Sequence, residues 1–285
     1  MSDHDNELGL FLRARREAVT PAAVGLPAGP RRRTPGLRRA ELATLAGVSV
    51  EYLTRLEQGR DRRPSAGVLS TLADVLQLTT PERVHLFRLT KAAEGFRCTG
   101  GQPRPSLTVR PAVQALLARM EPTPAVLLNR LGDALAHTDG YARLAGPLGL
   151  LDGTPPSLAR FVFTDPRART VFPDWEHVAD EQVAALKQGP FRADAHVAAL
   201  VDELTVAAGE AFTRRVATVP GVPSTNGVAR WVHPEGGELR LAYETLELPA
   251  DDLRIVVHLP GDETTAEALH TLTAPAPRAL RAVPD

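Results

Sequence analysis

The sequence predicts two domains of different fold class: an all-α domain at the N-terminus and an α+β domain with an antiparallel sheet at the C-terminus. Apolar residues recur at helical spacing up to about residue 92, whereas a period-two alternation appears only in the later part of the chain. Residues 93–106 are rich in Gly and Pro and are the expected linker. The length of 285 residues is sufficient for two domains of ordinary size.

The two parts also differ in charge. Residues 1–104 carry a net charge of +6, and residues 105–285 carry a net charge of −7. A basic surface favours contact with a polyanion such as nucleic acid, and an acidic surface does not. We therefore expect any contact with nucleic acid to be confined to the N-terminal domain, residues 1–92.

Apolar periodicity predicts a series of helices in this domain. Their expected ranges are 7–18, 38–46, 50–58, about 66–76 and about 81–91. The last of them starts at Pro81, and proline is favoured in the first turn of a helix. The connection 19–36 is rich in Pro, Gly and Arg and is longer than most links between helices, which indicates a functional loop.

The second and third of these helices are joined by a tight turn. Gly47 suits the left-handed conformation that ends a helix, and the Ser49 hydroxyl suits the cap of the next one. On that next helix Leu53 and Leu56 point inward. The residues that point outward together are Val50, Glu51, Thr54, Arg55 and Gln58. A helix with such a face fits the major groove of B-DNA.

Ala43, Gly47 and Leu53, spaced four and then six apart, resemble the helix-turn-helix pattern, and the ending Leu56–Gly59 resembles its phage-repressor, or XRE, branch. The longer runs RRRTPGLRRAELATLAGVSVEYLTRLEQGRDRRPS and LADVLQLTTPERVHLFRLT resemble the actinobacterial regulators typified by MmyB. The resemblance implies a repressor-like domain of five helices that ends near residue 92. It also implies a structural ion pair between Arg16 and Glu57.

The outward face predicts sequence-specific recognition of double-stranded DNA. Arg55 suits guanine, Glu51 can accept from cytosine, and Val50 suits a thymine methyl group. The residues expected to face the bases are Ser49, Val50, Glu51, Thr54 and Arg55. The residues expected to contact the phosphate backbone are Arg38, Gln58, Arg60, Arg62 and Arg63. Because one such helix covers only a few base pairs, we expect a homodimer on the operator.

Arg31, Arg32 and Arg33 form a charge run just before the helix pair. One interpretation is an arm that contacts phosphates or the minor groove, and the other is a solvated loop. We favour the arm because the run directly precedes the recognition motif.

Helices and strands are mixed in the second domain, residues 107–275, and residues 276–285 are expected to form a flexible tail. The expected helices are 111–120, near 139–145, near 155–163, 173–187, about 194–214 and 264–272. The expected strands are 125–129, 134–137, 227–232, 239–246 and 253–259. In the fourth strand Leu239, Leu241 and Tyr243 alternate with polar or small residues, which is the period of a strand. This order predicts an antiparallel sheet with helices inserted, an α+β domain.

The segments LNRLGDALAHTDGYARL, ARFVFTDPRARTVFPDW and GELRLAYETLELPADDLRIVVHLP are similar to the C-terminal PAS-like ligand-binding domain of the MmyB-like regulators. That similarity implies a fatty acid or another hydrophobic small molecule between sheet and helices. The candidate ligand-binding residues are Asn129, Arg160, Arg167, Trp175 and Trp231. The alternative interpretation is that the tryptophans belong to the core and the arginines are solvated.

The resulting functional hypothesis is a DNA-binding transcription regulator that senses a small ligand. A rival hypothesis is a protein-interaction module for which the N-terminal domain serves as a tether to DNA. A filled core with an exposed apolar patch in residues 107–275 would favour the rival. A buried apolar cavity with one polar end would favour the sensor.

The sequence gives no sign of catalysis. The eight histidines are scattered, no pair has metal-ligand spacing, and the phosphate-binding, dinucleotide-binding and nucleophile motifs are absent. The single cysteine, Cys98, cannot form an internal disulfide. No apolar run approaches the roughly 18 residues of a membrane span, and the N-terminus is unlike a secretory signal. We therefore expect a cytoplasmic protein that is not an enzyme and has no cofactor, metal or membrane partner.

Overall fold

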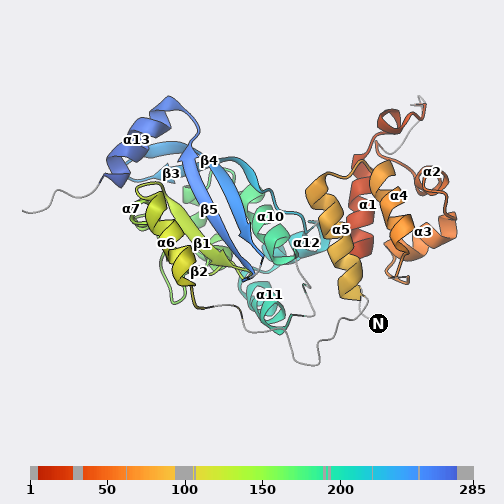
Figure 1. Cartoon of the computed structure of the whole chain (residues 1–285), viewed down its shortest axis with the longest axis horizontal. Coiled ribbons are helices and arrows are strands. Elements are labelled where there is room, and N and C mark those ends of the chain that lie inside the picture. Colours follow the sequence, from red (N-terminus) through yellow and green to blue (C-terminus); the bar gives the residue numbers. More distant parts are fainter. Residues whose placement is uncertain are drawn as a thin grey trace, which may run out of the picture. The chain divides into compact units, whose positions relative to one another are not determined.

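A computed structural model of the whole chain defines the fold (Figure 1). The residues that the structure describes are 6–27, 35–61, 63–93, 105, 107–188, 191, 194–219, 221–249 and 251–274. The charge run 31–33, Arg62, Cys98 and the expected tail lie outside these residues.

The chain divides into two compact units, and neither is a single stretch of sequence. The first unit comprises Met1–Pro103 and Val183–Pro223. The second unit comprises Arg104–Gln182 and Ser224–Asp285. The sequence boundaries 1–92, 93–106, 107–275 and 276–285 remain a prediction.

The described N-terminal part of the first unit is helical, as predicted. Its elements are α1 (Glu7–Ala18), the short 3₁₀-helix η2 (Pro21–Val24), α2 (Arg39–Leu45), α3 (Val50–Glu57), α4 (Ala66–Val75) and α5 (Thr80–Ala93). Side-chain caps fix several starts: the Asn6 amide oxygen accepts from Gly9 N at 3.1 Å, and the Ser65 hydroxyl accepts from Val68 N at 3.3 Å. These caps satisfy backbone donors that the first turn of a helix leaves without a partner.

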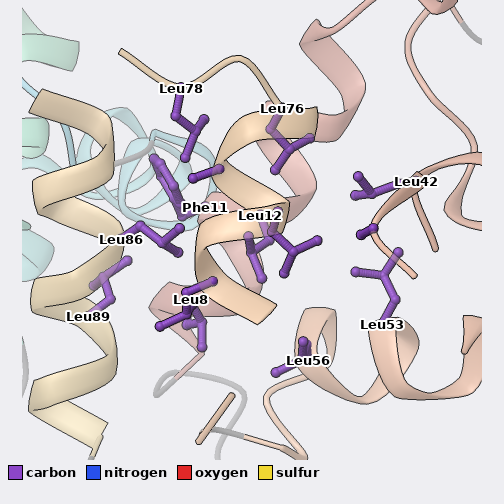
Figure 2. Packing of buried hydrophobic residues seen from close by; sticks show 14 of the residues in the cluster. Leu8, Phe11, Leu12, Leu42, Leu53, Leu56, Leu76, Leu78, Leu86 and Leu89 are labelled. Atoms are coloured by element: carbon purple, nitrogen blue, oxygen red, sulfur yellow. The ribbon is translucent and has the colours of Figure 1, made fainter. Parts of the chain in front are cut away.

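The core of this part is aliphatic and continuous. Figure 2 shows side chains from α1, α3 and α5 that point toward a common centre, among them Leu12, Leu53 and Leu86. All three are fully buried. Burial of a leucine side chain stabilises a fold by about 1.5–3 kcal/mol, so these contacts hold the five α-helices together.

Two further helices, α11 (Ala195–Ala208) and α12 (Glu210–Thr218), also belong to the first unit. The prediction of one helix over 194–214 was wrong, because the helix breaks at Gly209. That residue has φ 56° and ψ −131°, a conformation that is accessible to glycine but not to ordinary residues. Helical periodicity continues across the break, so the apolar pattern gave no sign of it.

The second unit is an α+β domain, which confirms the predicted fold class. Its strands are β1 (Ala125–Asn129), β2 (Ala134–His137), β3 (Asn226–His233), β4 (Gly237–Leu248) and β5 (Leu253–Pro260). They form one sheet in the order β2-β1-β5-β4-β3, with every neighbouring pair antiparallel. Figure 1 shows β1 and β5 side by side although they are far apart in the sequence.

The helices of the second unit are α6 (Pro111–Met120), α7 (Asp139–Ala145), α8 (Leu158–Thr164), α9 (Ala168–Val171), α10 (Trp175–Leu186) and α13 (Glu263–Thr273). The boundary between the units falls inside α10, whose last residues belong to the first unit.

The two faces of the sheet have different neighbours. Leu127 and Ile255 share one face and pack against Val113 and Leu117 of α6. Successive side chains of a strand alternate between faces, so His258 lies on the other face. There its ring lies 5.7 Å from the ring of Tyr141 in α7. The sheet is therefore covered by helices on both faces, as an α+β fold with a buried sheet requires.

Candidate functional site

The turn between α2 and α3 has the predicted geometry. Gly47 has φ +64°, and a Cβ at this position would meet no atom within 4 Å, so glycine is favoured here by conformation rather than by space. The Ser49 hydroxyl accepts a hydrogen bond from Tyr52 N at 3.0 Å and starts α3. Leu53 is fully buried and fills the crossing of the two helices. The helix pair is thus a helix-turn-helix motif.

The outward face of α3 has the composition that the sequence predicted. Val50 is 39% exposed, and Glu51, Arg55 and Gln58 are exposed as well. Thr54 is half-buried, and its hydroxyl donates to Val50 O at 2.7 Å. The Arg55 guanidinium lies 5.7 Å from the centre of the Tyr52 ring, where a cation–π contact favours an ordered side chain. The face therefore presents an acceptor, a cation and an apolar group on one helix.

A buried charge network holds the C-terminal end of α3. The Glu57 carboxylate is 1% exposed and receives Arg16 Nε at 2.6 Å on one oxygen and Arg39 Nε at 2.6 Å on the other. Burial opposes the charge on Arg16, but the hydrogen bonds and the negative charge of Glu57 outweigh it and raise the pKa of this guanidinium. Asn6 Nδ2 also donates to Glu57 O at 2.7 Å. The recognition helix is thereby fixed to α1 and α2.

The predicted Arg16–Glu57 pair is present, and the structure adds Arg39 to it. Arg39 begins α2 and is 42% exposed, so its charge did not stand out from the other arginines of this basic segment. Arg39 precedes Leu42 and Ala43 by three and four positions, so it lies on the same side of α2 as these buried residues. That spacing was the sequence signal for a role of Arg39 at the core.

The residues expected to contact phosphates lie around the ends of the helix pair. Arg38 is exposed just before α2, and its backbone N donates to Glu41 Oε2 at 2.7 Å. Arg60 and Arg63 are exposed beyond the end of α3. Contacts with the DNA backbone require exposed cations beside the recognition helix, and Arg60 and Arg63 meet this requirement. Their contact with DNA remains a prediction.

Asn129 is buried and its amide is fully engaged within the β1–β2 turn. Its Oδ1 accepts from Leu131 N at 2.9 Å and from Asp133 N at 3.0 Å, and its Nδ2 donates to Asp133 Oδ2 at 3.0 Å. Arg160 of α8 donates to Asp133 Oδ1 at 3.3 Å. The structure therefore brings Asn129 and Arg160 to the same carboxylate.

Arg167 lies on the surface between two carboxylates. Its guanidinium donates to Asp165 Oδ2 at 2.6 Å and to Asp152 Oδ2 at 2.7 Å. Hydrogen bonds to both carboxylates raise the pKa of Arg167, and the same bonds lower the pKa of Asp165. Arg167 thus offsets one of the two negative charges of this acidic pair.

The two tryptophans are buried. The Trp175 indole N–H donates to Val162 O at 2.9 Å, and Arg169 stacks on its ring at 3.7 Å from the centre. Trp231 packs edge-on against Phe172 at 5.6 Å. Both positions agree with the interpretation of these residues as part of the core.

A pocket of about 520 Å³ opens at α8. Its lining combines glycines, hydroxyl groups, an aromatic ring and one cation: Gly149, Asp152, Gly153, Thr154, Pro155, Ser157, Arg160, Phe161, Thr164 and Asp165. Of the five candidate ligand residues, Arg160 lines this pocket and the other four do not. The five are therefore not gathered around it.

Sequence reasoning missed a buried polar pair beside Trp231. The His258 ring lies 5.1 Å from that of Trp231 and 5.7 Å from that of Tyr141. Burial lowers the pKa of His258 to about 4 and raises the pKa of Tyr141. Within the described residues, His258 Nδ1 is buried without a hydrogen-bond partner. In β5 the alternation marks the face of Leu253 and Ile255, and His258 lies on the opposite face, so the period-two pattern gave no signal for its burial.

The described geometry defines a class: a helix-turn-helix domain in a chain that also carries an α+β domain. The family profile of the helix-turn-helix domain matches residues 7–86. The profile described as the MmyB-like transcription regulator ligand binding domain matches residues 109–272, more than half of the chain. The chain therefore belongs to the MmyB-like transcription regulators. No curated protein matches it.

Two further structural findings concern the described part of the chain. It contains no group of His, Cys, Asp or Glu side chains arranged to hold a metal ion. It also contains no helix that combines the length and apolar character needed to cross a bilayer.

Proposed function

We propose that this ligand-sensing transcription regulator reads a specific DNA sequence with α3, as a cytoplasmic homodimer, and responds to a fatty acid or a similar hydrophobic molecule in its second unit. We assign it no catalytic role. The observation that carries the DNA-reading part is the outward face of α3, where Val50, Glu51 and Arg55 are exposed together on a helix held from behind by Glu57. A rigid helix with such a face can enter the major groove and contact base edges.

Arg55→Ala tests the base-reading role. The operator is first selected from a random-sequence library with the native protein, and affinity is then measured at fixed salt. We expect a loss of about 1–3 kcal/mol on the operator and relaxed preference at one base pair. Arg60→Ala is the matched control, because loss of a phosphate contact weakens binding on every sequence alike. An equal loss for Arg55→Ala on all sequences would contradict its role.

The ligand proposal is supported by the pocket at α8. Its volume of about 520 Å³ lies in the range of roughly 300–1,000 Å³ that is usual for small-molecule sites. Phe161 and Pro155 supply apolar surface, and the Arg160 guanidinium supplies a cation for a carboxylate head group. The Arg160 side chain is 37% exposed, so a ligand carboxylate has access to it.

The acidic rim of this pocket is partly offset by Arg167. Asp152 and Asp165 both line the pocket, and Arg167 binds both of them. One guanidinium offsets one of the two negative charges, so the repulsion that an anionic ligand meets there is reduced but not removed. Arg167 would act on the ligand through these carboxylates rather than by direct contact.

Native mass spectrometry of the purified protein, together with thermal shifts across a panel of straight-chain fatty acids, tests the ligand proposal. We expect a bound lipid mass or a rise in the melting temperature, because a ligand that binds only the folded state stabilises it. Arg160→Met is expected to abolish the shift. Arg169→Met is the control, since Arg169 stacks on Trp175 instead. No bound mass and no shift with any fatty acid would count against the ligand.

The second candidate function, a DNA-tethered protein-interaction module, is favoured by one surface. Val228, Leu246 and Leu259 are 52%, 44% and 43% exposed on the sheet face that α6 also occupies. Exposed apolar groups in a cluster are typical of interaction surfaces. If the native protein carries no ligand, and Leu259→Arg abolishes association with itself or a partner, the interaction module is the better description.

A further inference from the structure

Residues 183–223 belong to the first unit although the ligand-binding-domain profile spans them. Three residues make contacts of this kind. Val222 packs against the aliphatic core of α1, α3, α4 and α5. Lys187 pairs with Glu7 of α1, and Gly221 approaches His85 of α5. A segment that is continuous with the ligand-binding domain in sequence is thus packed on the DNA-binding helices.

Lys187 is a buried lysine that connects three elements. Its side chain is 1% exposed, follows the last residue of α10 directly, and lies 2.9 Å from Glu7 Oε2. Glu7 stands in the first turn of α1, where the helix dipole favours a negative charge. The Lys187 ammonium also donates to Val216 O at 3.0 Å and to Val219 O at 2.7 Å, at the C-terminal end of α12. All three ammonium hydrogens have acceptors, as a buried charge requires.

Gly221 marks a close approach between the returning chain and α5. A Cβ at this position would lie 2.5 Å from Lys187 O and 2.8 Å from His85 Cε1. Only a residue without a side chain fits there unless backbone shifts. His85 packs its ring edge-on against Phe11 of α1, with ring centres 5.2 Å apart. The chain after α12 is therefore in contact with α5, which itself packs against α1 through His85.

Helix α1 connects the Lys187–Glu7 ion pair to the recognition helix α3. Glu7 opens α1, and nine residues later Arg16 on the same helix binds Glu57 at the end of α3. Helix α10, which ends one residue before Lys187, connects the same ion pair to the ligand-binding unit. It begins at Trp175, whose indole N–H donates to Val162 O of α8. α8 carries the pocket residues Arg160 and Phe161.

We propose that Lys187, the end of α12 and the segment of Gly221 and Val222 form a seat for α1 and α5, and that α10 transmits the state of the ligand-binding unit to this seat, with the Lys187–Glu7 ion pair as its latch. This inference rests on the proposed function. Since coupling between sites is reciprocal, an event at the DNA face must also change the seat and α10. The physical requirement is a chain of rigid elements whose position both sites bias.

The seat is tested first without DNA or ligand, on the full-length protein. Lys91 and Lys187 are the only lysines in the sequence, so acetylation by an amine-reactive ester followed by mass spectrometry reports Lys187 individually. We expect Lys187 to react at least about tenfold more slowly in the native chain than in urea. Gly221→Ala should raise the rate of Lys187 acetylation in the native chain at least about fivefold, because the added Cβ displaces the backbone at Lys187 and exposes its ammonium group. Gly67→Ala is the control, because its Cβ would meet nothing closer than 4.0 Å.

Coupling is then tested with the selected operator duplex as the probe. We expect operator binding to change hydrogen exchange in α10 and α12 and the acetylation rate of Lys187. In Glu7→Gln the operator should still protect α3, but the response of α10 and α12 should disappear. Arg13→Gln, which alters an exposed pair on the same helix, should behave like the native protein.

The outcomes separate the two proposals. Operator protection of α3 with no change in α10 or α12 would overturn the coupling and leave the DNA-reading function intact. Fast native acetylation of Lys187, unaffected by Gly221→Ala, would overturn the seat. Absence of any sequence-selective DNA binding would refute the proposed function instead, and the coupling with it.

Discussion

Two buried charges in the first unit are held in contrasting ways. Glu57 receives two guanidinium groups, both from helices of the N-terminal domain. Lys187 is bound by one carboxylate of that domain and by two carbonyl groups near the end of α12. The Glu57 network closes within about 60 residues of sequence, whereas the Lys187 network joins residues that are 180 positions apart.

This difference shows how each network contributes. If Glu57 is neutralised, Arg16 remains as a buried charge with an 8% exposed side chain. If Lys187 is removed, the charged partner left behind is Glu7, whose side chain is 20% exposed and has access to water, and the other two partners are neutral carbonyl groups. The first network is therefore required for the fold of the DNA-binding helices, and the second can be released at lower cost.

The largest effect is expected for Glu57→Gln. Removing one partner of a buried ion pair costs about 3–5 kcal/mol, and the partner that Arg16 then retains, Glu17, is 51% exposed and holds it less well. Hydrogen exchange of α3 amides measures it directly, since both tryptophans belong to the second unit and do not report on this core. Glu17→Gln is the control, because Glu17 is 51% exposed in its pairs with Arg13 and Arg16. A loss in Glu57→Gln no greater than in the control would show that the network is not structural.

Local sequence pattern was sufficient for the elements whose physical causes are local. The cap at Ser49, the left-handed Gly47 and the inward pair Leu53 and Leu56 lie within ten residues and predicted the helix-turn-helix geometry. The period-two alternation of β4 likewise predicted its strand, because Leu239 and Leu241 on one face of this strand are buried and their neighbours Glu238 and Arg240 are exposed.

Features set by distant contacts were not predictable. Lys187 shows no sign in the sequence of its Glu7 partner, which lies 180 positions away. Candidate ligand residues were chosen as polar or aromatic groups beside apolar segments, a criterion that also selects core residues. Trp175 and Trp231 meet it and are buried in the core, whereas Arg160 meets it and lines a pocket.

The second-largest effect is a loss of stability at low pH, and it is expected near the Lys187 network. His85 lies beside the Lys187 network, and burial together with the positive charges of Arg88, Lys187 and Arg15 lowers its pKa to about 4. Above an unfolded-state pKa of about 6.5 the imidazole is neutral in both states. As pH falls from there to about 4, the unfolded chain binds the proton first, so stability is lost by up to about 3 kcal/mol.

His85→Leu checks this assignment, because leucine keeps an apolar side chain in place of the imidazole. We expect the stability of the first unit to fall less between pH 7 and pH 4 in this variant than in the native chain. Hydrogen exchange of α1 and α5 amides at several pH values supplies the measurement. Equal slopes in the two proteins would mean that His85 does not titrate between folded and unfolded states.

A smaller effect is expected for Lys187→Met. Methionine retains most of the buried chain volume, so the loss arises from Val216 O and Val219 O, which each lose a donor. We expect destabilisation of about 2 kcal/mol, measured by hydrogen exchange of α12 amides. Combining it with Glu7→Gln should add little, because both changes remove the same ion pair. Full additivity would argue against a direct interaction.

The smallest effect is expected for Arg39→Ala. Arg39 is 42% exposed, and Arg16 still binds Glu57 after its removal, so the buried carboxylate keeps a compensating charge. Solvent screens this half-exposed pair, and we expect a loss of at most about 1 kcal/mol in α3 protection. The combination Arg16→Met with Arg39→Ala should cost more than the sum of the single changes, because Glu57 then has neither cation. A double variant that is only additive would show that Arg16 alone determines the position of the recognition helix.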